Sequence, residues 1–200
     1  MFDNPYEVHI LGKATILNDE ISAMDNIVQH MSSQTEEMKR VLTECSYATF
    51  GEQFERAVTE AEQLSDVLYE KAFELNKVQH DLVRYIDKID IFNDRPPSGI
   101  PPRPFNVERI HVEANIRYDR LTKVILEDLI RGISGYCMSI ADLTRQMIYQ
   151  RDSIGEKWRD PQFHQYSRFI DEIVDVNQKG VSVLIDYSNY LFGKLKEFEE

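Results

Sequence analysis

The amino-acid sequence predicts an all-α protein made of two tandem, long antiparallel helical hairpins. Apolar residues recur at alternating steps of three and four along four long segments, which is the spacing of one face of an α-helix. Two turn signals divide these segments into pairs, and a proline-rich stretch separates the pairs. The expected product is an elongated four-helix bundle or coiled-coil-like assembly, in which the hairpins either pack on each other or are held apart by the linker.

The first helix is expected from about residue 10 to residue 46. Its apolar positions keep a heptad spacing, and neither proline nor glycine interrupts them. Three are methionines, whose adaptable side chains suit an internal core and a partner interface alike; we prefer the core interpretation. The positions are Leu17, Ile21, Met24, Val28, Met31, Thr35, Met38, Leu42 and Cys45.

The second helix is expected from about residue 50 to residue 91. Its other positions are rich in Glu, Asp and Lys, and acids such as Glu62 and Glu70 are interpreted as a solvated face. A helix of this length is roughly 60 Å long, so each hairpin should be a rod. Its apolar stripe consists of Phe54, Val58, Ala61, Leu64, Leu68, Ala72, Leu75, Val78, Leu82, Ile86 and Ile89.

The clearest boundary in the chain is the stretch 93–106, which holds five of the seven prolines. Such a segment is semi-rigid and extended. We therefore divide the chain into a first hairpin at 1–92, a linker at 93–106 and a second hairpin at 107–200. The spacing Pro101-x-x-Pro104 could fit a proline-recognising groove, but a plain spacer is the preferred interpretation.

The third helix is expected from near Val107 to near Ser153. Gly132 and Gly135 lie in its middle, where they would permit either a close helix approach or a kink. Its apolar positions are Ile110, Ala114, Leu121, Ile125, Leu129, Tyr136, Ile140, Leu143 and Met147.

The fourth helix is expected from Pro161 to about Phe198. A single Asn in its apolar seam, Asn177, could fix the register of the bundle or could simply face solvent. The seam consists of Phe163, Tyr166, Ile170, Ile173, Asn177, Val181, Leu184, Ser188, Leu191, Leu195 and Phe198.

The turn of the second hairpin is predicted around the only tryptophan, Trp158. Gly155 is expected to break the incoming helix, Asp160 is a favourable N-cap, and Pro161 suits the first helical position. The turn of the first hairpin is predicted at 49–54, where Thr49 and Glu52 have capping-box spacing. The two turns match with one insertion, Phe50-Gly51-Glu52-Gln53-Phe54 against Trp158-Arg159-Asp160-Pro161-Gln162-Phe163, which indicates an internal duplication.

The charge of the chain is −12 and is spread unevenly, with 8 basic and 19 acidic residues in 1–94 but 15 and 16 in 95–200. Nucleic-acid binders usually present a basic face, so DNA or RNA is not an expected partner. An acidic first half favours a basic partner surface.

Cellular location is predicted from what the sequence lacks. It has neither a run of about 18 apolar residues nor a secretory signal peptide, so we expect no membrane span and a cytoplasmic protein, with export by another route left open. Cys45 and Cys137 fall on apolar helical positions and are interpreted as buried thiols in a reducing compartment.

Catalytic motifs are also missing. A di-iron bundle needs two Glu-x-x-His units, and only Glu108-Arg109-Ile110-His111 has this form. We find no glycine-rich phosphate loop and no nucleophile elbow. We therefore expect no enzyme activity, no metal and no cofactor.

The two turns resemble those of the WXG family, the small helical-hairpin proteins of type VII (ESX-like) secretion systems. Trp158-Arg159-Asp160 with Phe163 is similar to divergent forms of the family's Trp-x-Gly turn, and Phe50-Gly51-Glu52 with Phe54 supplies the aromatic residue and an offset glycine. The resemblance implies that Phe50, Gly51, Phe54, Trp158, Asp160 and Phe163 are hairpin-turn or partner-binding residues. The family's export signal, Tyr-x-x-x-Asp/Glu, is absent after Tyr85, Tyr187 and Tyr190.

The sequence as a whole is interpreted as that of a helical interaction protein. The resemblance implies a secretion chaperone, a targeting factor, or a partner of a type VII-like secreted protein or toxin. The alternative is a self-assembling coiled-coil scaffold with no secretion role, and a metal or enzyme bundle is the least favoured hypothesis.

Overall fold

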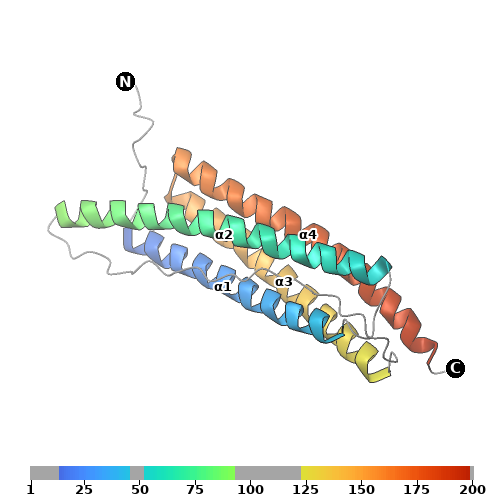
Figure 1. Cartoon of the computed structure of the whole chain (residues 1–200). Helices are drawn as coiled ribbons and strands as arrows, with labels where there is room; N and C mark the ends of the chain where they lie inside the picture. The colour runs from blue at the N-terminus through green and yellow to red at the C-terminus, as the bar shows by residue number, and fades with distance from the viewer. Residues whose placement is uncertain (1–13, 46–51, 93–122, 199–200) are drawn as a thin grey trace.

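The computed structural model describes residues 14–45, 52–92 and 123–198, which form four long helices. These are α1 (Ala14–Cys45), α2 (Glu52–Phe92), α3 (Lys123–Lys157) and α4 (Pro161–Lys196). They lie side by side in an elongated bundle (Figure 1). The predicted all-α fold class is confirmed.

The helices are arranged as a ring in the order α1, α3, α4, α2. Helix α1 contacts α2 and α3, α4 contacts the same two helices, and the contact between α1 and α2 is the least extensive. Neighbours in the ring run antiparallel, so residues 93–122 join α2 to a helix that begins at the opposite end of the bundle (Figure 1). The described helices of the two halves therefore pack on each other and are not held apart.

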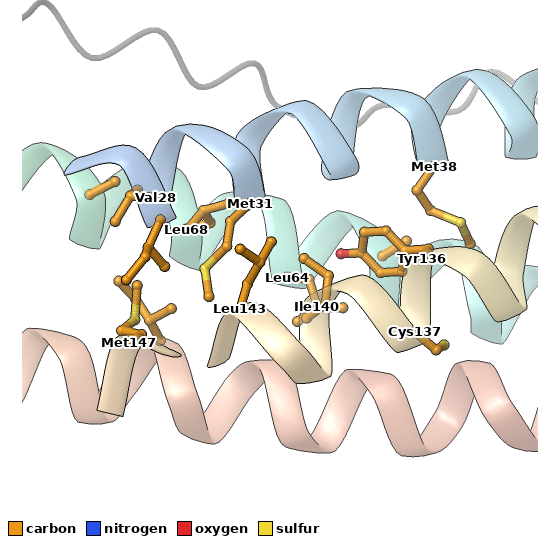
Figure 2. Packing of buried hydrophobic residues seen from close by; sticks show 14 of the residues in the cluster. Val28, Met31, Met38, Leu64, Leu68, Tyr136, Cys137, Ile140, Leu143 and Met147 are labelled. Atoms are coloured by element: carbon orange, nitrogen blue, oxygen red, sulfur yellow. The ribbon is translucent and has the colours of Figure 1, made fainter. Parts of the chain in front are cut away.

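One cluster of buried apolar side chains from all four helices forms the core. The predicted α1 positions from Leu17 to Leu42 are all buried, as are most of the predicted positions of the other helices. Figure 2 shows Met31 of α1 and Leu143 and Met147 of α3 together in the space between these two helices. The methionines of α1 thus belong to the internal core, which was the preferred of the two interpretations.

Two glycines allow neighbouring helices to approach closely. A Cβ atom on Gly132 of α3 would lie 2.7 Å from Cγ1 of Val41 in α1, and one on Gly180 of α4 would overlap the side chain of Leu64 in α2. Gly135, in contrast, is exposed and has no such neighbour within 4 Å. Of the two roles predicted for the α3 glycines, close approach is therefore the one found at Gly132.

The predicted helix boundaries need two corrections. Helix α3 runs through Gly155 to Lys157 and does not end near Ser153. Gly155 does not break the helix; a Cβ atom there would lie 2.7 Å from Cζ of Phe163, so the missing side chain makes room for this ring. The predicted helix start near Val107 and the linker 93–106 lie outside the described residues.

The structure corrects the prediction at one position of the fourth seam and decides between the two alternatives at another. Phe198 follows the end of α4 and is 50% exposed, so it does not belong to the core. Asn177 is buried, and its Nδ2 donates to Oγ1 of Thr144 in α3 at 3.2 Å. The alternative that Asn177 faces solvent is therefore wrong. Its role in fixing the register of the bundle stays a prediction.

Candidate functional site

The turn between α3 and α4 is organised by Trp158 and Asp160. The backbone N–H of Trp158 donates to the carbonyl of Ile154 at 2.9 Å, which continues the pattern of α3. The carboxylate of Asp160 then accepts the indole N–H of Trp158 at 2.7 Å on one oxygen. Its other oxygen accepts the backbone N–H groups of Gln162 at 2.7 Å and Phe163 at 3.0 Å. The predicted N-cap is confirmed, and one side chain joins the end of α3 to the start of α4.

Aromatic side chains surround this turn on the inside of the bundle. The ring of Trp158, which is 0% exposed, lies 5.6 Å between centroids from both Phe163 and Tyr166. The hydroxyl of Tyr166 accepts a hydrogen bond from Nε2 of Gln79 in α2 at 2.9 Å. Burial raises the pKa of Tyr166 well above its ordinary value of 10, so it stays protonated. The turn is thereby tied to α2 as well as to α3 and α4.

Helix α1 is tied to the same end of the bundle through the carboxylate of Glu20. This group accepts hydrogen bonds from Nζ of Lys157 at 2.7 Å, from Oγ of Ser153 at 2.9 Å and from Nε2 of Gln150. The side chains of Glu20 and Lys157 are 22% and 23% exposed, so this ion pair is only partly screened by water. All four helices therefore meet at the Trp158 end.

Glu20 is expected to make the stability of the bundle depend on pH. Burial alone raises the pKa of Glu20, but the hydrogen bonds from Lys157, Ser153 and Gln150 lower it below its ordinary value of 4.5. A lowered folded-state pKa gives stability that is present above pH 4.5 and lost as the pH falls through the folded-state value. The variant Glu20→Gln should be less stable than the wild type by about 1 kcal/mol at about pH 7.

Urea unfolding of both chains between about pH 7 and about pH 3 measures this effect. The difference in free energy of unfolding should shrink below pH 4.5, because a protonated Glu20 is as uncharged as the glutamine that replaces it. The matched control is Glu36→Gln at an exposed position of α1. A difference that stays constant over the whole pH range would show that the charge of Glu20 has no such role.

The residues predicted from the two turns do not form one site. Trp158, Asp160 and Phe163 lie together at one end of the bundle, whereas Phe54 lies at the other end, with its ring 6.2 Å from that of Tyr187. Phe54, Trp158 and Asp160 are buried. Phe50 and Gly51 lie outside the described residues. In this arrangement the buried turn residues hold helices together and offer little surface to a partner.

The described part of the chain offers few groups suited to metal binding or nucleophilic chemistry. It contains no group of three or more His, Cys, Asp or Glu residues that could hold a metal ion. Cys137 is buried as predicted, and burial raises its pKa to about 11, so the thiol is protonated at neutral pH. Glu108, His111 and the side chain of Cys45 lie outside the described residues.

The surface along α1 and α3 is hollowed over much of its length. Three hollows follow one another; the first and second share Gln34, and the second and third share His30. Met138 borders the middle hollow and Tyr149 the third, and each of these α3 side chains is 75% exposed. We call this surface the α1–α3 face, with the outer residues His30, Gln34, Arg131, Gly135, Met138, Asp142, Arg145 and Tyr149.

Sequence reasoning missed Met138 and Tyr149, because both lie on the side of α3 away from its apolar seam. The signal that could have found them is an apolar residue placed among outward-facing charges such as Arg131 and Arg145. Single exposed apolar residues are common on protein surfaces and carry little information. Their significance here comes from the neighbouring hollows, which only the packing of α1 on α3 creates.

Comparison with known proteins gives no match: no protein-family model, curated protein or solved structure matches the chain. In the part of the chain that the structure describes, no helix has the length and apolar character needed to cross a membrane.

Proposed function

We propose that this chain is a non-enzymatic helical interaction protein whose α1–α3 face binds another helical protein. The observation that carries the proposal is the pair of exposed side chains Met138 and Tyr149 beside a row of hollows between two antiparallel helices. A groove between helices with apolar anchors at its rim suits an amphipathic helix laid along it. Met is adaptable and Tyr gives large contact area at low entropic cost, which suits both to a binding surface.

The biological setting that we propose is secretion. Trp158-Arg159-Asp160 resembles the turn of WXG proteins, and this resemblance supports a chaperone, targeting factor or partner of a type VII-like secreted protein or toxin. The proposed location is the cytoplasm, with export without a signal peptide as the alternative. Trp158 itself has a structural role in the proposal, because its ring is buried at the turn.

A self-assembling protein is the second candidate. The observation that favours it is the charge of α3, which carries five basic and five acidic residues in a chain of net charge −12. A neutral surface lets copies of an acidic protein meet without strong repulsion.

Affinity purification from the native host tests the proposal. We expect a helical partner to come with the tagged wild-type chain and to re-form a stoichiometric complex from purified components. The double variant Met138→Glu/Tyr149→Glu should weaken that complex at least about 100-fold, because each change replaces an exposed apolar anchor with a charged side chain.

The matched control is Tyr69→Glu/Phe73→Glu, which makes the same kind of change at exposed positions of α2. This control should keep the partner. Equal binding by both variants would contradict a role for the α1–α3 face, and recovery of no partner by the wild-type chain would contradict the secretion-related part of the proposal.

A further inference from the structure

We infer that the partner fitted by the α1–α3 face is a second copy of this chain, with the two α3 helices antiparallel about a twofold axis near Asp142. The inference rests on the proposed function, which makes this face a docking surface. It adds which protein occupies that surface. Twofold dimers are the commonest homo-oligomers, and in them each surface patch contacts itself.

The distribution of charge favours α3 or α4 over α1 and α2 as the contact helix. Helix α1 carries six acidic and two basic residues, and α2 carries ten and five, so two copies meeting through α1 and α2 would repel each other. Helix α3 carries five of each sign. Helix α4 is also balanced in charge, but the hollows beside Met138 and Tyr149 are lined by α1 and α3.

Two antiparallel copies of α3 place complementary residues opposite each other. Gly135 lies seven residues before Asp142, and Tyr149 lies seven residues after it. Seven residues make about two helical turns, so all three positions are on the same side of the helix. An axis near Asp142 therefore places Tyr149 of each copy opposite Gly135 of the other.

The surroundings of Gly135 suit an aromatic ring. Gly135 lines a hollow together with Val41 and with charged side chains of α1 and α3, and no atom outside the adjoining backbone of α3 lies within 4 Å of the position that its Cβ would take. A ring that enters this hollow is the kind of central anchor in a pocket that dominates binding energy. Tyr149 is 75% exposed on a lone copy. In the dimer the Tyr149 side chains of both copies would be buried in the two equivalent hollows.

Charges flanking these anchors also match. In the same register, Asp152 of one copy directly faces position 132 of the other, which is next to Arg131. The side chains of both residues are largely exposed, at 78% and 64%. Each Asp142 near the axis already accepts hydrogen bonds from Arg145 at 3.0 Å and Gln146 at 2.7 Å. Two Asp142–Arg145 pairs at the axis form a group with no net charge, which limits repulsion between the two carboxylates.

Sedimentation equilibrium of the purified full-length chain tests the inference. The wild-type chain should have twice the monomer mass of 23.5 kDa at micromolar concentration. The variant Met138→Glu/Tyr149→Glu should raise the dissociation constant on the order of 100-fold. Its helical circular dichroism and melting temperature at low concentration should match those of the control Tyr69→Glu/Phe73→Glu, which should remain dimeric.

A charge exchange tests the antiparallel register separately. Arg131→Glu and Asp152→Arg should each weaken the dimer several-fold, and the chain carrying both changes should recover most of the loss. If the two positions do not face each other, the chain with both changes should not recover dimer affinity, even if each single change weakens the dimer. A wild-type monomer at about 100 μM, a dimer unaffected by Met138→Glu/Tyr149→Glu, or a double exchange without recovery would overturn the inference.

These outcomes are distinct from failure of the proposed function. A monomeric wild-type chain that binds a helical partner through Met138 and Tyr149 overturns the second copy as occupant and leaves the docking surface in place. A dimer held by Met138 and Tyr149 that recovers no partner from the host supports the inference and contradicts the secretion role.

Discussion

Replacing Trp158 with alanine is expected to lower the free energy of unfolding by about 3–5 kcal/mol, the usual loss for a large aromatic side chain in a core. The ring is 0% exposed and contacts Phe163 and Tyr166, so its removal leaves a cavity where all four helices meet. It also removes the indole N–H that donates to Asp160, the N-cap of α4. Urea unfolding followed by helical circular dichroism at one protein concentration measures the change.

Two variants separate packing from hydrogen bonding at this turn. Trp158→Phe keeps most of the ring but removes the donor to Asp160, and should cost only about 1–3 kcal/mol. Tyr149→Ala removes an exposed ring on a monomer and should change stability by less than about 0.5 kcal/mol. A loss below about 1 kcal/mol for Trp158→Ala would show that Trp158 does not hold the helices together at this end.

Replacing Gly180 with valine is expected to lower the free energy of unfolding by about 1–3 kcal/mol through overpacking between α2 and α4. A Cβ atom at this position would overlap the Leu64 side chain, with Cγ of Leu64 only 2.6 Å away, so the whole side chain has to move. The stiff χ1 of valine leaves little room for adjustment. Thermal unfolding of the two chains gives the difference.

The cause can be checked by removing the neighbour. Leu64→Ala in the same chain should make Gly180→Val far less costly than it is in the wild type, because the two side chains compete for one space. Gly193→Ala is the matched control, since no atom outside the adjoining backbone of α4 lies within 4 Å of its Cβ position. It should raise stability by up to about 1 kcal/mol through helix propensity alone. Equal effects of Gly180→Val with and without Leu64 would contradict the close approach.

Much of the fold follows from local patterns in the sequence. The heptad positions of α1 identify its buried side, because they depend only on helical period and the apolar character of residues such as Met24 and Leu42. The start of α4 follows from Asp160 and Pro161, whose effects act within one turn of the chain. These features need no knowledge of the neighbouring helix.

Features that depend on how one helix packs on another could not be predicted from local sequence patterns. An apolar stripe does not say which helix covers it, so the contact of α1 with α3 was not specified. Gly155 looks like a helix breaker in the sequence and is explained only by the Phe163 ring that lies against it. Glu20 carries no local signal, because its partner Lys157 is brought to it by the packing of α1 on α3.

Oxidation of Met138 measures most directly whether the outer α1–α3 face is a docking surface. Met138 is 75% exposed, whereas Met24, Met31, Met38 and Met147 are buried, so a lone copy should react with hydrogen peroxide at Met138 much faster than at these four. Peptide mass spectrometry gives the rate at each methionine. We expect oxidation of Met138 to slow as the protein concentration rises or a purified helical partner is added, while the buried methionines keep their slow rates. A rate at Met138 that stays the same under both conditions would contradict it.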